Sequence, residues 1–196
     1  MFDNVLNMND HITSICKSAS FQLHKIGKIR QYLTQEASAQ LIHAFVTSRL
    51  DYCNSLLSGL PLASLHRLQR IQNIAARILT RTKKFDHITP VLKSLHWLPI
   101  HLRIKFKILL LCYRIFNGLA PSYLCDLLTP YKQSRTLRSS SKSLLVIPES
   151  RLKTYGDRSF AYVAPSLWNK LPMDIRDAPS LETLKSHLKT HLFSSF

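Results

Sequence analysis

Residues 100–117 read IHLRIKFKILLLCYRIFN, and this stretch decides the fold class. Apolar side chains cover nearly the whole circumference of the helix that it would form, which indicates a helix buried on most sides. Pro99 suits the first turn of that helix, and Gly118 suits its end. We therefore expect a long buried central helix in a mainly α-helical protein. Its one exposed strip is expected to carry three basic side chains, Arg103, Lys107 and Arg114.

Residues 62–83 carry the clearest amphipathic pattern in the chain. One face of the predicted helix is apolar and must pack, and it consists of Leu65, Leu68, Ile71, Ala75, Ile78 and Leu79. The opposite face is basic and carries Arg67, Arg70, Arg77, Arg81 and Lys84. At a rise of 1.5 Å per residue, this row spans about 25 Å, which is long enough to follow several phosphates. The alternative is an ordinary solvated outer face.

Other segments predict further helices and one short pair of strands. Apolar spacings of three and four predict helices over residues 10–31, 34–58, 89–96, 121–128 and 180–193. Thr34 is expected to cap the second of these helices, with Ala37, Leu41, Ala44, Phe45, Ser48 and Tyr52 on one face. Residues 131–142 are basic and rich in Ser, and are expected to form a loop. Leu144–Ile147 is expected to form a short strand that pairs near Arg151–Tyr155. The expected fold is thus an irregular multi-helix bundle with a small β-hairpin and a loop-rich C-terminal segment.

The composition points to a polyanionic partner. The 196 residues include 27 Lys and Arg but only 11 Asp and Glu, a net charge of +16. Nucleic acid, an acidic membrane surface and an acidic protein all fit this excess. Only four Gly are present, so a Gly-rich loop that cradles phosphate is not expected. No apolar run is long enough for a membrane span, no secretory signal is visible, and the four Cys suit reduced, buried thiols, so we expect a nuclear or cytoplasmic protein.

The sequence offers no motif for catalysis, metal binding or a cofactor. The acidic residues are scattered singly, and no Y-x-D-D or D-x-D run is present to hold catalytic metal ions. His187 and His191 have a spacing that metals accept, but no third ligand and no general base lie nearby in the sequence. No G-x-S-x-G motif accompanies the serines. We therefore expect no metal, no cofactor and no catalytic residue.

Five separate motifs occur in the order found in one known family. They are SRLDYCNSLL at 48–57, LQRIQNIAAR at 68–77, LHWLPIHLRIKFK at 95–107, APSLWNKLPMDIR at 164–176 and LKTHLF at 188–193. Together they resemble the C-terminal part of LINE-type (non-LTR) retrotransposon reverse transcriptases, and the jockey-like group fits best. The likeness covers nearly the whole chain. Leu184 is a departure, because Phe is expected at that position.

This resemblance implies a function in nucleic-acid binding without polymerase activity. In that family the palm, with its metal-binding acids, lies upstream, so the chain resembles a 5′-truncated copy of an element, or a gene model that begins at an internal Met. The resemblance implies three segments: a palm-proximal remnant and first helix at 1–33, a helical thumb-like bundle at 34–130, and the basic loop, hairpin and last helix at 131–196. Expected partners are RNA or DNA backbones and an upstream palm domain where one exists, but no membrane. The expected backbone contacts are Arg67, Arg70, Arg77, Arg81, Lys84, Arg103, Lys107, Arg135, Arg138 and Lys142. The alternatives are a non-catalytic helical scaffold that binds an acidic protein, and an inactive pseudogene product.

Overall fold

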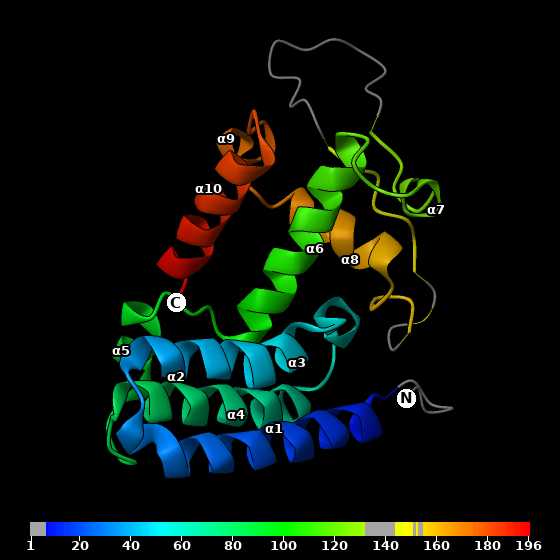
Figure 1. The fold of residues 1–196 in the computed structure, drawn as a ribbon. Coiled ribbons are helices and arrows are strands. Elements are labelled where there is room, and N and C mark those ends of the chain that lie inside the picture. The colour runs from blue at the N-terminus through cyan, green and yellow to red at the C-terminus, as the bar shows by residue number, and fades with distance from the viewer. Residues whose placement is uncertain (1–6, 132–143, 151, 153–154) are drawn as a thin grey trace. The chain divides into compact units, whose positions relative to one another are not determined.

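The structure is a computed structural model that describes residues 7–131, 144–150, 152 and 155–196. The described residues are mainly helical, as predicted, and they contain no named strand (Figure 1). The chain divides into two compact units, residues 1–103 and residues 104–196. The first helix shares a unit with the helices that follow it.

Unit 1 is built from α1 (Asn9–Ile29), α2 (Gln35–Ile42), α3 (Ser48–Asp51), α4 (Leu62–Thr80) and α5 (Ile88–Ser94). A 3-10 turn at Arg30–Tyr32 follows α1, and Thr34 caps α2 as predicted, since its hydroxyl accepts from the Ala37 amide at 3.2 Å. The helices α1 and α4 lie side by side and run parallel, and their predicted apolar faces are the ones that are buried (Figure 1). The buried residues of these two faces include Ile12, Ala19, Leu23, Ile26, Leu65, Leu68, Ile71, Ala75 and Leu79.

The helix predicted over 34–58 is wrong in two respects. A π-helical turn at His43–Thr47 separates α2 from α3, and the chain then leaves the helix at Tyr52 and turns at Cys53, which has φ 52°. A 3-10 turn, Asn54–Leu57, follows. The buried side chains are Ser38, Ile42, Val46 and Leu50. The predicted face instead leaves Ala44, Phe45, Ser48 and Tyr52 exposed. The wider π turn shifts the angular register, which a helical wheel of 3.6 residues per turn does not include.

The predicted central helix is α6 (Ile100–Phe116), and it is the element in which the two units meet along the chain. The Pro99 carbonyl accepts from the Leu102 and Arg103 amides at 3.0 and 2.9 Å, so the helix begins where Pro99 predicts. At the other end, Gly118 has φ 66° and the Leu119 amide donates to the Arg114 carbonyl at 2.8 Å, as in a Schellman motif. The helix is buried at Ile100, Leu102, Ile104, Ile108, Leu109, Leu110, Cys112 and Tyr113.

Unit 2 packs α7 (Ser122–Cys125), α8 (Phe160–Trp168), α9 (Met173–Arg176) and α10 (Leu181–Ser194) with the rest of α6. The fully buried Trp168 ring stacks on Phe116 with centroids 5.3 Å apart. The Tyr113 hydroxyl donates to the Ala178 carbonyl at 2.9 Å. Ser180 caps α10, since its hydroxyl accepts from the Thr183 amide at 3.1 Å. The predicted inward face of α10 is buried at Leu184, Leu188 and Leu192.

The described residues contain no named strand where the hairpin of Leu144–Ile147 with Arg151–Tyr155 is predicted, and Arg151, Lys153 and Thr154 lie outside the described residues. Leu145 forms an isolated antiparallel bridge with Pro130, through the Tyr131 amide to the Leu144 carbonyl and the Val146 amide to the Thr129 carbonyl, both at 2.9 Å. On its other side, the Asn169 side-chain amide takes the place of a second strand. It accepts from the Leu145 amide at 3.0 Å and donates to the Leu145 carbonyl at 2.8 Å. A side chain therefore satisfies the backbone groups that a hairpin would have paired.

Candidate nucleic-acid interface

The predicted basic face is only partly on the exposed side of α4, because Arg67 and Arg77 are half-buried and Arg81 and Lys84 follow the end of the helix. Arg70 is exposed and, within the part of the chain that the structure describes, makes no hydrogen bond or ion pair. Arg67 is half-buried, and its Nη2 donates to the Thr13 hydroxyl of α1 at 2.8 Å. Arg81 is exposed in a left-handed conformation just after α4, with φ 58°. Arg70 and Arg81 thus keep their charges available to solvent, whereas part of Arg67 ties α4 to α1.

Arg77 organises the loop after α4. Its Nη2 donates to the Asp86 carbonyl at 2.7 Å and its Nη1 donates to the Lys83 carbonyl. The Asp86 carboxylate in turn accepts from the Lys83 amide at 3.1 Å. The guanidinium of Arg77 is therefore used to hold the loop, and the exposed Lys83 and Lys84 present their charges from it.

Arg30 is a structural arginine that the sequence pattern did not single out. Its Nε donates to the Ile78 carbonyl at 3.0 Å and its Nη2 to the Leu79 carbonyl at 2.9 Å. These are carbonyls of the last turn of α4, which lack partners within the helix. Nη1 donates to the Leu33 carbonyl at 2.8 Å. One side chain thus joins the ends of α1 and α4, and no local sequence signal marks a contact across 48 residues.

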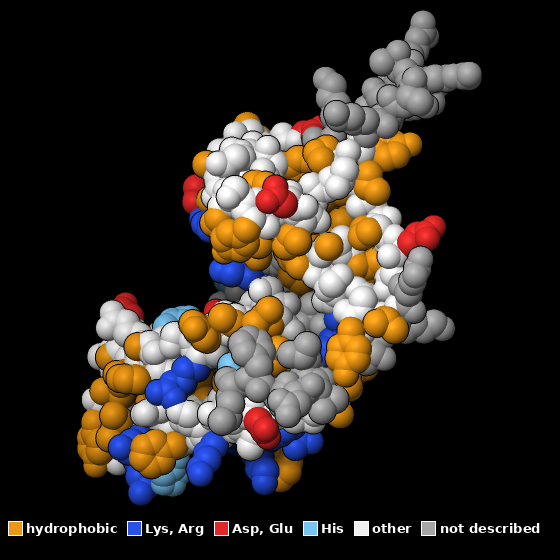
Figure 2. Space-filling model, turned by 90° about the vertical axis from the view of Figure 1, so that its right-hand side faces the viewer, with side chains coloured by type: hydrophobic (Ala, Val, Ile, Leu, Met, Phe, Trp, Pro, Cys, Tyr) orange, Lys and Arg blue, Asp and Glu red, His pale blue; other side chains and the backbone are white. Residues whose placement is uncertain are grey.

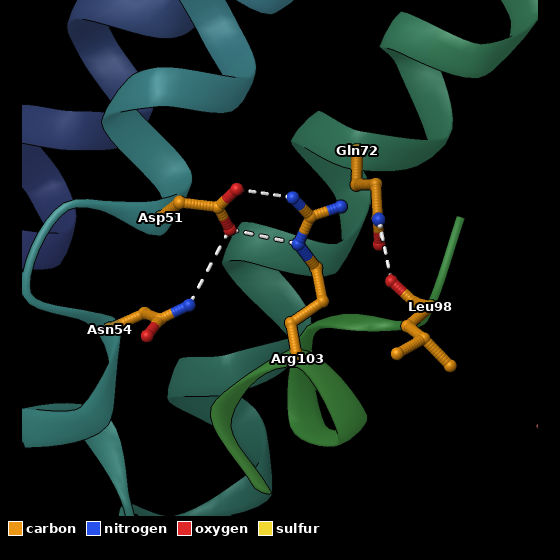
Figure 3. A network of polar contacts seen from close by, with 5 residues as sticks. All are labelled: Asp51, Asn54, Gln72, Leu98 and Arg103. Atoms are coloured by element: carbon orange, nitrogen blue, oxygen red, sulfur yellow. Dashed lines mark hydrogen bonds and ion pairs between the residues drawn. The ribbon is translucent and has the colours of Figure 1, made fainter. Parts of the chain in front are cut away.

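Arg103 is the clearest correction to the expected contacts (Figure 3). Its Nε donates to Asp51 Oδ1 at 2.8 Å, and its Nη2 pairs with Asp51 Oδ2. Asn54 Nδ2 also reaches Asp51 Oδ1, at 3.4 Å. Gln72, nearby on α4, donates to the Leu98 carbonyl at 2.9 Å. Arg103 therefore joins the start of α6 to the end of α3 and is not part of an exposed strip, because the fold brings an acid 52 residues away against it.

The remaining expected contacts lie in unit 2 or outside the described residues. Lys107 is exposed on α6. Arg135, Arg138 and Lys142 lie outside the described residues, so their prediction stays a prediction. The structure adds exposed lysines on α1 that the sequence analysis missed, although a helical wheel of residues 10–31 could have found them. They are Lys17, Lys25 and Lys28.

Basic side chains outnumber acidic ones in unit 1. Residues 1–103 contain thirteen Lys and Arg but five Asp and Glu, and α4 contains no acid. Two ion pairs of the described residues are Arg103–Asp51 and Lys185–Glu182, and the first of them uses one of the five acids of unit 1. On the face drawn in Figure 2, Lys and Arg side chains gather over the lower part of unit 1, where α1 lies in Figure 1. A surface of this kind attracts polyanions.

A shallow groove of about 460 Å³ lies between the parallel helices α1 and α4. Its lining includes Leu23 and Gly27 of α1 and Ile74 and Ile78 of α4, together with the polar Ser20, His24 and Lys28. A Cβ at Gly27 would lie 3.7 Å from Ile78 Cδ1, an ordinary van der Waals contact. The groove thus combines an apolar floor with basic side chains at its edge.

The four cysteines differ in burial and in the pKa of their thiols. Burial raises the pKa of Cys112 to about 12. Burial also raises the pKa of Cys16, and the charge of Arg67 partly opposes that shift. Of the four free cysteines, Cys112 alone is fully buried and Cys53 is exposed, so the expectation of buried thiols is correct only for Cys112. Among the described residues, no three His, Cys, Asp or Glu side chains gather where they could hold a metal ion.

Two further findings concern membrane-spanning helices and similarity to known proteins. In the part of the chain that the structure describes, every helix is too short or too polar to span a bilayer. Comparisons with protein-family models, curated proteins and solved structures found no match to this chain. The exposed basic surface and the motifs in the sequence are therefore the features that indicate a function.

Proposed function

We propose that the chain is a nucleic-acid-binding module, related to the C-terminal part of a LINE-type reverse transcriptase, that holds RNA or DNA by its backbone. The observation that carries this proposal is the exposed, un-neutralised positive charge of α4 and the loop after it. Arg70, Arg81 and Lys84 are exposed and have no acidic partner among the described residues. They are the residues that we propose for direct phosphate contact.

The dimensions of this surface suit a backbone-binding role. Arg70 and Arg81 are separated by eleven residues, which corresponds to roughly 16 Å along a helix. Duplex DNA carries one negative charge per about 1.7 Å of its axis, so a row of that length passes many phosphates. Contacts of this type position a nucleic acid without reading its sequence. We propose that catalysis is not a function of this chain, because its sequence holds no Y-x-D-D or D-x-D acids.

Binding measured against salt concentration tests the proposal. With a fluorescent RNA–DNA hybrid of 20 base pairs, the slope of log K against log [KCl] should be about −3 or steeper, because each neutralised phosphate releases counterions. The triple variant Arg70→Gln, Arg81→Gln, Lys84→Gln should make the slope shallower by about 3. Lys185→Gln is the matched control, since Lys185 already pairs with Glu182 at 2.6 Å. A triple variant with the wild-type slope would contradict the proposal.

A second candidate function is supported by the groove between α1 and α4. Its apolar floor and basic edge suit an acidic amphipathic helix of a partner protein as well as a nucleic acid. A pull-down repeated after nuclease treatment separates the two functions. Partners that remain bound after the nucleic acid is digested would favour the scaffold, and partners that are lost would favour backbone binding.

A further inference from the structure

We propose that Phe85 is a base-stacking residue that receives an unpaired nucleobase at the end of the basic row. This inference rests on the proposed function and narrows it to nucleic acids with a single-stranded segment. Phe85 is 91% exposed, more than any other large hydrophobic side chain among the described residues. A buried Phe side chain would stabilise the fold, and unit 1 leaves this ring exposed to solvent instead.

The loop that carries Phe85 is held in shape before any ligand binds. The Asp86 amide donates to the Lys83 carbonyl at 3.3 Å, which closes a turn with Lys84 and Phe85 at its tip. The Lys83 amide donates to the Asp86 carboxylate at 3.1 Å, and Arg77 donates to the carbonyls of Lys83 and Asp86. A ring presented by a preformed turn loses little conformational freedom when it binds, which favours recognition.

The positive charges near the Phe85 ring indicate which class of ligand it binds. Arg81, Lys83 and Lys84 are exposed and lie within four residues of Phe85 in the sequence, and Lys84 Nζ lies 5.7 Å from the Phe85 ring centroid. The one acid of this loop, Asp86, directs its carboxylate to the Lys83 amide. An exposed aromatic face among cations is the combination by which proteins bind single-stranded nucleic acid, with bases on the ring and phosphates on the cations. A paired base in the middle of a duplex has no free face, so the ligand needs an unpaired base.

Fluorescence of a Phe85→Trp variant tests the stacking directly. The native Trp97 and Trp168 are buried, so a new Trp at position 85 is the one that an added oligonucleotide can reach. A 12-nucleotide single strand should quench the new emission, whereas a blunt duplex of the same sequence should quench it much less. Tyr123→Trp is the matched control, because Tyr123 is also exposed but lies in residues 121–130, which contain Asp126 and no Lys or Arg.

Affinity measured on the same oligonucleotides gives a second readout. Phe85→Ala should weaken single-strand binding roughly 5- to 140-fold, which is the range expected for one stacked base. The salt slope should not change, because no charge is removed. Tyr123→Ala should leave both quantities unchanged, and circular dichroism should show that both variants keep the helix content of the wild type.

The possible results separate the stacking role of Phe85 from the proposed nucleic-acid binding and from membrane binding. Salt-dependent binding that is indifferent to Phe85→Ala would overturn the stacking role and leave the proposed function standing. Absence of any salt-dependent binding by the wild-type chain would overturn both. A blue shift of the new Trp on phosphatidylserine-containing vesicles, without quenching by the single strand, would show a membrane-anchoring tip and would also overturn the inference.

Discussion

Replacing Asp51 by Asn should destabilise unit 1 by about 1–2 kcal/mol. The Asp51 carboxylate accepts from both Nε and Nη2 of Arg103, and the two side chains are 40% and 20% exposed. An exposed ion pair contributes about 0–1 kcal/mol, whereas losing one partner of a buried pair costs about 3–5 kcal/mol. Because both side chains are partly exposed to solvent, we expect the free-energy loss for the Arg103–Asp51 pair to lie between these two ranges. For a chain of this length, the loss corresponds to a fall in Tm of about 2–8 °C.

A double-mutant cycle isolates the contribution of the pair. The variants are Asp51→Asn, Arg103→Met and the double change, each measured by urea unfolding followed by circular dichroism. We expect a coupling free energy of about 1 kcal/mol or more, because each single change leaves the other charged or polar group without its partner. The exposed Lys185–Glu182 pair serves as the control, with an expected coupling below about 0.5 kcal/mol. Equal coupling in the two pairs would refute the reasoning.

Three further outcomes follow from single residues. Arg30→Met should lower the free energy of unfolding by about 1–3 kcal/mol in urea titrations, because the Ile78 and Leu79 carbonyls lose their donor. An unchanged urea midpoint would show that Arg30 does not stabilise the end of α4. Gly118→Ala should cost about 1–2 kcal/mol from its φ of 66° alone, since a Cβ there meets no atom within 4 Å, and a larger loss would indicate a clash. With a thiol reagent at pH 8, Cys53 should react rapidly and Cys112 only on unfolding. Burial raises the pKa of Cys112 from an ordinary 9.0 to about 12, so the unfolded chain binds fewer protons than the folded chain between those pH values. The contribution of Cys112 to the free energy of unfolding should therefore fall as pH rises from 9 toward 12.

Several elements could be predicted because their signals are local. The apolar periodicity of residues 62–83 predicts which face of α4 is buried, since a helix must bury its hydrophobic stripe. Ser180 and Thr34 predict the first turns of α10 and α2, where a hydroxyl accepts from a nearby amide. Gly118 predicts the end of α6 because a left-handed residue there suits glycine. Each of these features depends on residues within a few positions of one another.

Other elements could not be predicted, because the local sequence favours the observed structure and its alternatives about equally. The π turn at His43–Thr47 changes the face that the second helical segment buries, and no residue type marks it. Leu145 pairs with Pro130 and with the side chain of Asn169, which are both distant from it in sequence. A short strand finds its partner through the packing of the surrounding unit, which sequence alternation does not specify.

The basic surface shows most clearly which features the sequence determines and which ones the tertiary structure decides. Composition and helical periodicity alone predict a positively charged protein with Arg67, Arg70, Arg77 and Arg81 along one side of a helix, because charge and angular spacing are properties of the chain itself. Which guanidinium groups remain available depends on the assembled unit, where Asp51 occupies Arg103 and loop carbonyls occupy Arg77. These partners lie 6 to 52 residues away in sequence, and only folding brings them within hydrogen-bond distance.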